Sequence, residues 1–244
     1  MYKAGLQKRP ASFLYLCYHS FWQAVDWLLP PECGGCGKKG VRWCQNCQDQ
    51  VERIGSDICL ICGAPQSQIQ ICKNCKQIRP AFQILRSMAA FRGPIREGLH
   101  RLKYKRDIAL GDCLSQKLTN YFDELNWEVD LVVPVPLSSI RLRQRGYNQS
   151  ALLARPLALA RQIKYSTTAL LRIKDTLSQV GLTISLRRQN VSNAFWANPS
   201  KVNGRKVLLI DDVCTSGATL NECAIALKKG GALSVWGLTV AREV

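Results

Sequence analysis

Long hydrophobic runs, histidines and acidic residues are all scarce in this chain of 244 residues. Each scarcity disfavours a class of protein or of site. No apolar run approaches the roughly 20 residues that a membrane-spanning helix needs, so we expect no transmembrane segment. The only histidines are His19 and His100, so a catalytic site in which histidine is the base for a nucleophilic cysteine is disfavoured. The 17 acidic residues stand against 34 basic ones, and the formal net charge is +17.

The basic excess indicates a polyanionic partner. It is spread over the whole chain and is densest in residues 151–200. Nucleic acid, phosphorylated ligands and an anionic membrane are the partners that such a charge favours. General solubility is the alternative explanation, and the charge alone does not decide between them.

The most apolar stretch is residues 11–30, ASFLYLCYHSFWQAVDWLLP. Polar residues interrupt it, and Leu16 rather than a small residue precedes Cys17, which disfavours a cleaved signal sequence. Apolar residues recur at helical spacing, at Leu14, Tyr18, Phe21, Val25 and Leu28. Residues 1–30 therefore predict an amphipathic helix that docks on the protein's own core, with a membrane surface or a partner as the alternative. We expect a cytoplasmic protein, with peripheral attachment to a membrane left open.

Eight of the twelve cysteines form four CxxC pairs, separated by 7, 11 and 9 residues. Two such turns place four sulfurs around one Zn²⁺, whereas disulfides suit exported chains and a redox motif needs only one pair. The pattern predicts two structural zinc sites in a double zinc ribbon over residues 31–80. Sequential pairing is the simplest arrangement, and an interleaved one remains open. The predicted ligands are Cys33, Cys36, Cys44, Cys47, Cys59, Cys62, Cys72 and Cys75.

Alternating strands and helices follow the cysteines. Strands are expected at residues 81–91, 129–137, 206–212 and 232–241, and helices at 93–107, 108–125, 147–164 and 217–229. This repetition predicts an α/β fold with a mainly parallel sheet and helices on its faces. Ligands in such sheets bind at the carboxyl ends of the strands.

The segment VLLIDDVCTSGATL, residues 207–220, places two acids and a glycine-containing loop at such a strand end. Backbone N–H groups at the start of the next helix, hydroxyls of Thr215, Ser216 and Thr219, and a tight turn at Gly217 would form a phosphate cradle. The loop lacks the lysine of a P-loop and the pattern GxGxxG.

Two carboxylates beside a phosphate cradle suit ribose hydroxyls and a Mg²⁺ ion, which prefers oxygen ligands. Phosphate, ribose and a magnesium-bound pyrophosphate together describe phosphoribosyl pyrophosphate (PRPP). Residues 207–219 also resemble the PRPP-binding motif of type I phosphoribosyltransferases, in which two acids and an apolar residue precede T-[ST]-G-x-T.

Further segments make the whole chain resemble the ComF family. They are VPVPL at 133–137, RQRGYNQSALLA at 143–154 and QVGLTISLRRQNVSNAF at 179–195. Members of this family are phosphoribosyltransferase-like proteins associated with natural transformation, and they carry a zinc ribbon ahead of the transferase domain. The resemblance covers about residues 25–242 and implies a type I phosphoribosyltransferase fold over residues 81–244.

The resemblance also implies roles for single residues. PRPP would be bound by Asp211, Asp212, Val213, Cys214, Thr215, Ser216, Gly217, Ala218 and Thr219. A pyrophosphate loop would be formed by Val135, Pro136 and Leu137. Cations for the leaving pyrophosphate would come from Lys103, Lys105 and Arg145, and from Arg187 in a loop at about 172–190.

The acceptor is not indicated by any motif. Basic residues interleaved with aromatics, at Arg42–Trp43, Lys103–Tyr104–Lys105 and Arg145–Gly146–Tyr147, are typical of proteins that bind single-stranded DNA. We therefore expect a PRPP-binding protein that handles incoming single-stranded DNA, with proteins of the DNA-uptake machinery as partners. The alternatives are a non-catalytic DNA-binding adaptor regulated by PRPP and a metabolic nucleobase or amido phosphoribosyltransferase. The amido type is disfavoured because Tyr2, not cysteine, follows Met1.

Overall fold

A five-stranded parallel sheet forms the centre of the molecule. The computed structural model describes residues 12–174 and 193–244. Within them, the strands lie in the order β1-β7-β6-β2-β3, and every neighbouring pair is parallel. The predicted α/β class is confirmed. The bounds are β1 (Ile84–Ala90), β2 (Leu131–Pro134), β3 (Lys164–Tyr165), β6 (Lys206–Cys214) and β7 (Ser234–Arg242).

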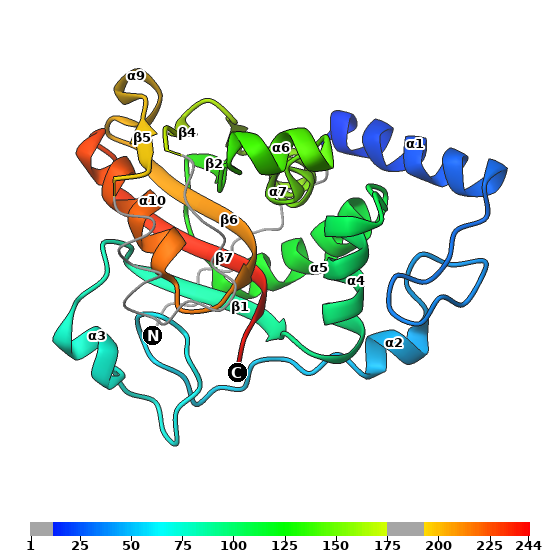
Figure 1. The fold of residues 1–244 in the computed structure, drawn as a ribbon, viewed down its shortest axis with the longest axis horizontal. Coiled ribbons are helices and arrows are strands. Elements are labelled where there is room, and N and C mark those ends of the chain that lie inside the picture. Colours follow the sequence, from blue (N-terminus) through cyan, green and yellow to red (C-terminus); the bar gives the residue numbers. More distant parts are fainter. Residues whose placement is uncertain (1–11, 175–192) are drawn as a thin grey trace.

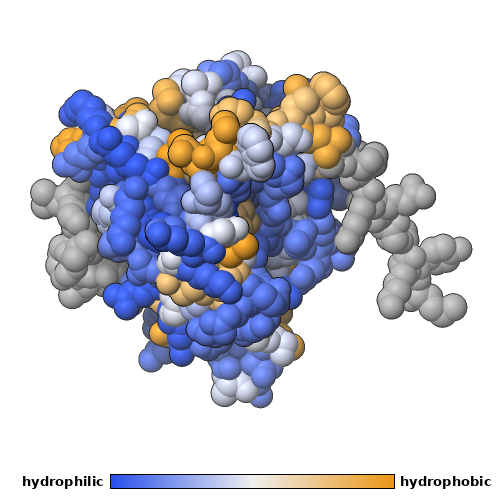
Figure 2. All heavy atoms as spheres, turned by 90° about the vertical axis from the view of Figure 1, so that its right-hand side faces the viewer, coloured by the Kyte–Doolittle hydropathy of each residue, from blue (hydrophilic) through white to orange (hydrophobic). Residues whose placement is uncertain are grey.

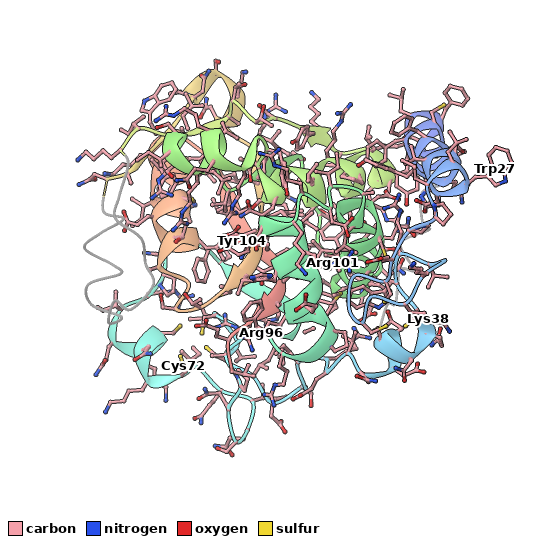
Figure 3. All side chains as sticks on the ribbon, turned by 45° about the vertical axis from the view of Figure 1, so that its right-hand side comes forward. Trp27, Lys38, Cys72, Arg96, Arg101 and Tyr104 are labelled. Atoms are coloured by element: carbon pink, nitrogen blue, oxygen red, sulfur yellow. The ribbon has the colours of Figure 1, made fainter. Side chains whose placement is uncertain are left out.

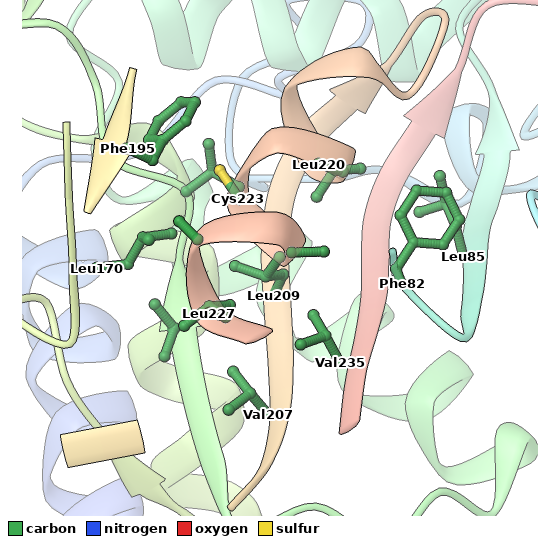
Figure 4. Packing of buried hydrophobic residues seen from close by; sticks show 14 of the residues in the cluster. Phe82, Leu85, Leu170, Phe195, Val207, Leu209, Leu220, Cys223, Leu227 and Val235 are labelled. Carbon is green, nitrogen blue, oxygen red and sulfur yellow. The ribbon is translucent and has the colours of Figure 1, made fainter. Parts of the chain in front are cut away.

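Both faces of the sheet are covered, which explains why β2 and residues 207–210 of β6 are continuously apolar. Val207 and Leu209 of β6 pack against α10 (Ala218–Lys229) and the hairpin of β4 (Leu170–Arg172) and β5 (Phe195–Ala197), as Figure 4 shows. Leu208 and Ile210 belong to the core on the opposite face. That face is covered by α4 (Gly93–Tyr104), α5 (Leu110–Leu125) and α7 (Gln149–Arg161), on the other side of the sheet from α10 (Figure 1).

Local signals set where the helices near the strand ends begin. Pro94 stands in the first turn of α4, where a missing N–H costs nothing. Side-chain oxygens of Ser138 and Asn148 cap α6 (Ser139–Arg145) and α7 by accepting from backbone N–H groups. These caps fix the chain that connects β2 to α7, which borders the cleft described below.

Several elements differ from the sequence-based expectation. Strand β2 ends at Pro134, because the chain then leaves the sheet as a loop. The pair β4–β5, the short β3, α6 and α9 (Pro199–Val202) were not predicted, because runs of two to seven residues carry little periodicity.

The cysteine-rich segment runs along the outer edge of β1 and contains α2 (Gln45–Asp49) and α3 (Lys73–Gln77) (Figure 1). The N–H of Leu85 donates to the Ile61 carbonyl at 2.8 Å, and the N–H of Ala90 donates to the Glu52 carbonyl at 2.8 Å. The segment therefore covers a strand edge that would otherwise expose unpaired backbone groups.

Helix α1 (Phe13–Leu28) forms as predicted, but the expected packing of its apolar stripe on the core is wrong. The side that faces the body is mixed: Tyr18 and Val25 are half-buried there, His19 Nδ1 lies 2.8 Å from Asp112 Oδ2, and Asp26 pairs with Arg42. No residue of the helix is fully buried. The exposed large side chains of this segment are Phe13, Leu14, Leu16, Phe21, Trp27, Leu28 and Leu29.

The outward face of α1 is therefore apolar. Trp27 is 83% exposed and points away from the rest of the chain in Figure 3. Hydrophobic side chains gather in the upper part of the face shown in Figure 2. Among the described residues, none of the helices has the length and apolar character needed to cross a bilayer.

Candidate functional site

Asp211 and Asp212 lie near the carboxyl end of β6, in the middle of the sheet. The neighbouring strand β2 ends at the same edge, and the N–H of Val135 donates to the Ile210 carbonyl at 2.9 Å. The acid pair therefore stands beside the loop that follows β2. This is the edge where parallel sheets bind ligands.

Side chains from two helices hold the acid pair. The Ser150 hydroxyl, in the first turn of α7, donates to Asp211 Oδ1 at 2.7 Å. Lys103, in the last turn of α4, forms an ion pair with Asp212 Oδ2. The Gln149 amide donates a long hydrogen bond of 3.4 Å to Asp212 Oδ1.

The two carboxyl groups ionise differently. Burial, together with the negative charge of Asp212, raises the pKa of Asp211 to about 7. Burial opposes ionisation of Asp212 as well, but the Lys103 ammonium outweighs it and holds the pKa of Asp212 below its usual range. Among the described residues, Lys103 forms its ion pair with Asp212, and its weaker effect on Asp211 does not offset burial. A bound cation would favour the ionised form of Asp211.

Residues 213–219 turn from β6 into α10. Gly217 precedes the helix with φ at 78°, a left-handed conformation that glycine adopts without strain. The N-terminus of a twelve-residue helix follows, and its backbone N–H groups and dipole favour an anion. Cys214 is buried, and burial raises the pKa of its thiol, so it is not placed as a nucleophile.

The acid pair and this loop line one cleft of about 900 Å³. Val135, Pro136 and Leu137 form part of its wall. Cationic side chains outnumber acidic ones around it. The cations are Lys103, Arg106, Arg141, Arg145 and Arg172, and the acids are Asp211, Asp212 and Glu243.

Arg145 is held at the cleft by two neighbours. Its Nη1 donates to Gln149 Oε1 at 2.8 Å, and its guanidinium carbon lies 5.1 Å from the centre of the Tyr104 ring. Tyr104 is 63% exposed at the end of α4 (Figure 3). The guanidinium is therefore positioned before any ligand arrives.

Most of the predicted site residues meet at this cleft, with two exceptions among those described. Lys105 does not line it, and its ammonium lies 4.0 Å from Glu97 on the exposed side of α4. Ser216 does not line it either, and its hydroxyl accepts from the N–H of Ala218. Arg187 lies outside the described residues.

Some lining residues were not predicted. Ser150 touches the acid pair, and Arg106, Arg141 and Arg172 line the cleft. The arginines belong to segments that are basic along their length, so their sequence positions did not single them out. Ser150 had one available signal, because it lies within the segment RQRGYNQSALLA that carries part of the family resemblance.

The basic–aromatic pairs are only partly available to a nucleic acid. Trp43 is half-buried beside the first cysteine cluster. Tyr147 donates its hydroxyl to the Leu102 carbonyl. Only Tyr104 of the three aromatics is largely exposed. At Trp43 and Tyr147 the aromatic side chain therefore contributes to packing within the protein.

The eight cysteines form two separate groups in chain order, which settles their pairing as sequential. The groups are Cys33, Cys36, Cys44, Cys47 and Cys59, Cys62, Cys72, Cys75. Within each group the sulfur atoms lie within 4.8 Å of one another. The sulfurs of Cys36 and Cys44 are 3.7 Å apart, and those of Cys62 and Cys72 are 3.8 Å apart.

This spacing fits zinc. Four sulfurs at about 2.3 Å from a tetrahedral Zn²⁺ lie roughly 3.8 Å apart. Backbone N–H groups of Cys44 and Cys72 donate to the sulfurs of Cys33 and Cys59, each at 3.3 Å. Such hydrogen bonds stabilise thiolates, so both groups suit a structural metal ion.

Comparison with known proteins agrees with both halves of the chain. Residues 24–76 match the family model described as a double zinc ribbon domain, and residues 107–242 match that of a phosphoribosyl transferase domain. These matches confirm the ribbon and the transferase domain that the sequence predicted. The exact boundaries at residues 30 and 80 remain predictions.

Relatives match over most of their length. Competence protein F of Haemophilus influenzae is 33% identical over 208 residues, which cover 81% of this chain and 90% of the relative. Competence protein ComFC of Bacillus subtilis is 30% identical over 241 residues, with 93% and 94% covered. DNA utilization protein YhgH of Escherichia coli K12 is 32% identical over 198 residues, with 79% and 86% covered.

Proposed function

The chain belongs to the ComF family, and we propose that its cleft binds PRPP with Mg²⁺ in a protein that handles single-stranded DNA during DNA uptake. One observation carries the proposal. A pair of acids, a glycine loop before a helix and several cations converge on a single cleft at the carboxyl edge of a parallel sheet. A phosphorylated ribose with a magnesium-bound pyrophosphate would use all three.

Each group has a role in this proposal. Asp211 and Asp212 bind the ribose hydroxyls and help hold Mg²⁺, for which carboxylate oxygens are suitable ligands. The loop at 213–219 holds the 5′-phosphate through backbone N–H groups and hydroxyls. Lys103 and Arg145 face the pyrophosphate, with the Val135–Leu137 loop beside them.

We further propose that the protein is an enzyme. In phosphoribosyl transfer, the bond from the anomeric carbon to pyrophosphate breaks and the acceptor forms a new bond to that carbon. The pyrophosphate leaves with the bonding electrons, so its growing charge must be stabilised. Lys103 and Arg145 would supply this by position, because both are fixed by neighbours in the free protein. Mg²⁺, when bound, would neutralise further charge on the same group.

Single-stranded DNA is the proposed polyanionic partner. Three features support this choice: the charge of +17, the arginines that line the cleft, and the relatives named for competence and DNA utilization. The exposed Tyr104 at the cleft provides one ring for base contact. DNA-uptake proteins as partners rest on the same relatives.

We also propose that the protein acts in the cytoplasm, with α1 attaching it peripherally to the membrane. Seven large apolar side chains are exposed on α1 and at Leu29, which follows it. Helices with one apolar face lie in the interface of a bilayer and are attracted by anionic lipids when the protein is basic.

The decisive first measurement is calorimetry of Mg²⁺–PRPP binding to the zinc-loaded protein, beside the variant that combines Asp211→Asn and Asp212→Asn. Wild type is expected to bind, and the double variant to lose at least about tenfold in affinity, because the neutral amides cannot hold Mg²⁺. The Asp49→Asn variant is the matched control at an exposed position, and it should bind like wild type. Absence of binding by the wild type would overturn the PRPP proposal.

Turnover separates an enzyme from an adaptor. Pyrophosphate release from PRPP in the presence of single-stranded DNA, absent in the double variant, supports transfer. Binding without release under the same conditions would leave a PRPP-regulated DNA-binding protein and remove the catalytic part of the proposal.

A further inference from the structure

The second cysteine cluster is built into the same core as the phosphate loop. Its residues Cys59, Cys72 and Cys75 belong to one buried apolar cluster with Leu85, Cys214, Ala218 and Leu220. The first cluster instead forms a small separate group with Trp43. The two metal sites thus differ in what lies behind them.

Close backbone contacts fix the second cluster against β1. Gly63, within its first knuckle, has φ at 69°, and a Cβ placed there would lie 2.6 Å from the Leu85 carbonyl oxygen. The Leu85 side chain reaches onward, because a Cβ placed on Gly217 would lie 3.6 Å from Leu85 Cδ2. One leucine therefore touches the surroundings of both the knuckle and the loop.

Arg242 connects the two more directly. It is the last residue of β7 and only 4% exposed, and its guanidinium donates to the carbonyl of Cys62. Its backbone is the sheet partner of Cys214, where the loop begins. The next residue, Glu243, donates its N–H to the Cys214 carbonyl at 3.0 Å.

Charge gives this contact its strength. Four thiolates around one Zn²⁺ carry a net charge of −2, and a buried guanidinium beside them is favoured by that charge. Without the metal the knuckle has no fixed geometry, because such small modules depend on their ion. The buried Arg242 would then lose both its acceptor and its counter-charge.

We propose that Arg242 is a positioning residue that ties the phosphate loop to the second zinc site. Metal loss at this site loosens residues 214–219 and weakens ligand binding in the cleft, whereas metal loss at the first site does not act through this route. By reciprocity of binding free energies, a ligand in the cleft also raises the affinity of the second site for its metal ion. The ligand part rests on the proposed function, and the loop part does not.

The first test is hydrogen exchange of the segment 214–219 in the ligand-free, zinc-loaded full chain. Arg242→Met should speed exchange of this segment about fivefold or more, and Arg242→Lys should restore part of the protection because it keeps a charge and a donor. Arg86→Met is the matched control. Arg86 donates to the Leu60 carbonyl at 3.1 Å and to the carbonyl of the zinc ligand Cys59 at 3.5 Å, but its backbone pairs with Leu238 and not with the loop. The Arg86→Met variant should change the exchange rate of segment 214–219 by less than about twofold.

The second test needs no variant of Arg242. The partition of zinc between the protein and a colorimetric chelator is measured at equilibrium with and without Mg²⁺–PRPP, and Cys62→Ser and Cys36→Ser assign the two sites. PRPP should raise the zinc affinity of the second site about fivefold or more and leave that of the first site unchanged.

The outcomes separate this inference from the proposed function. Equal loosening by Arg242→Met and Arg86→Met, or none by either, would overturn the inference even when PRPP binds. An equal rise in the zinc affinity of both sites on adding PRPP would do the same. Selective loosening by Arg242→Met in a protein that does not bind PRPP would support the inference and refute the proposed function.

Discussion

At the scale of single residues, the raised pKa of Asp211 makes a pH-dependent prediction about stability. The folded chain holds a proton at Asp211 up to about pH 7, whereas the unfolded chain, with an ordinary value of 3.8, releases it earlier. Ionisation of Asp211 therefore destabilises the ligand-free fold progressively between about pH 4 and pH 7. Asp211→Asn should be more stable than wild type by on the order of 1–2 kcal/mol above pH 7, and equal to it near pH 4.

Denaturant titrations across this pH range measure the difference. Asn keeps an oxygen that can accept from Ser150, so the hydrogen bond is preserved while the charge is removed. The exposed variant Asp49→Asn should show no comparable dependence on pH. A wild type as stable as Asp211→Asn at pH 8 would mean that the acid pair ionises without cost.

The sequence predicted those site residues that are contiguous and missed those that tertiary structure brings in. Asp211, Asp212 and the loop follow one another in the chain, so a single motif contained them. Ser150 reaches Asp211 of β6 from helix α7, and no local pattern encodes that contact. Lys105 follows the last residue of α4 and lies beside Glu97 rather than at the cleft, so its role in pyrophosphate binding stays a prediction.

At the scale of elements, length and burial decided what could be predicted. Strands β6 and β7 and helix α10 were found because each is a long apolar or periodic run. The alternation of strands and helices also predicted that β6 and β7 lie in one sheet. The β4–β5 pair escaped because three-residue strands depend on pairing with each other rather than on local preference.

Helix α1 was located correctly, and its orientation was not. Periodicity shows that one face is apolar, but it does not say which way that face points. The contacts His19–Asp112 and Asp26–Arg42 orient the helix so that Leu14, Phe21 and Leu28 of the predicted stripe face solvent. Only the structure contains this information, because the partners lie on other elements of the chain.

The proposed attachment through α1 predicts binding to lipid vesicles. The protein should sediment with vesicles rich in anionic phosphatidylglycerol and much less with neutral phosphatidylcholine. Combining Phe21→Ser with Trp27→Ser should weaken this binding by at least about tenfold, because two large apolar side chains are removed.

The control for this experiment is Gln23→Ala, an exposed polar position of the same helix, which should bind vesicles like wild type. Unchanged vesicle binding by the double serine variant would rule out α1 as the attachment surface. If wild type forms a dimer and does not bind vesicles, and the double variant is a monomer, a second copy covers this face instead.

At the scale of the whole molecule, the distribution of charge predicts how DNA binding depends on salt. Affinity for single-stranded DNA should fall linearly on a double logarithmic plot, because phosphate contacts release counterions. Arg141→Gln removes one cation from the cleft and should lower the slope by about 0.7. Fluorescence anisotropy with labelled oligonucleotides between low and moderate salt measures both.

Lys229→Gln is the matched control, because it removes an exposed cation at the end of α10 that is opposite the phosphate loop. It should leave the slope unchanged. DNA affinity that does not respond to salt, or slopes that respond equally to both substitutions, would contradict DNA binding at the cleft.

The position of β7 has a consequence for how the chain is made. This strand follows every other strand of its sheet in the sequence, yet it lies inside, between β1 and β6. During synthesis, β1 and β6 therefore leave the ribosome with a gap between them, and the centre of the sheet closes only when β7 arrives. Such distant pairings form slowly. The cysteine-rich segment precedes β1 and covers its outer edge, so a ribbon that has already taken up metal would shield part of the nascent sheet from neighbouring chains.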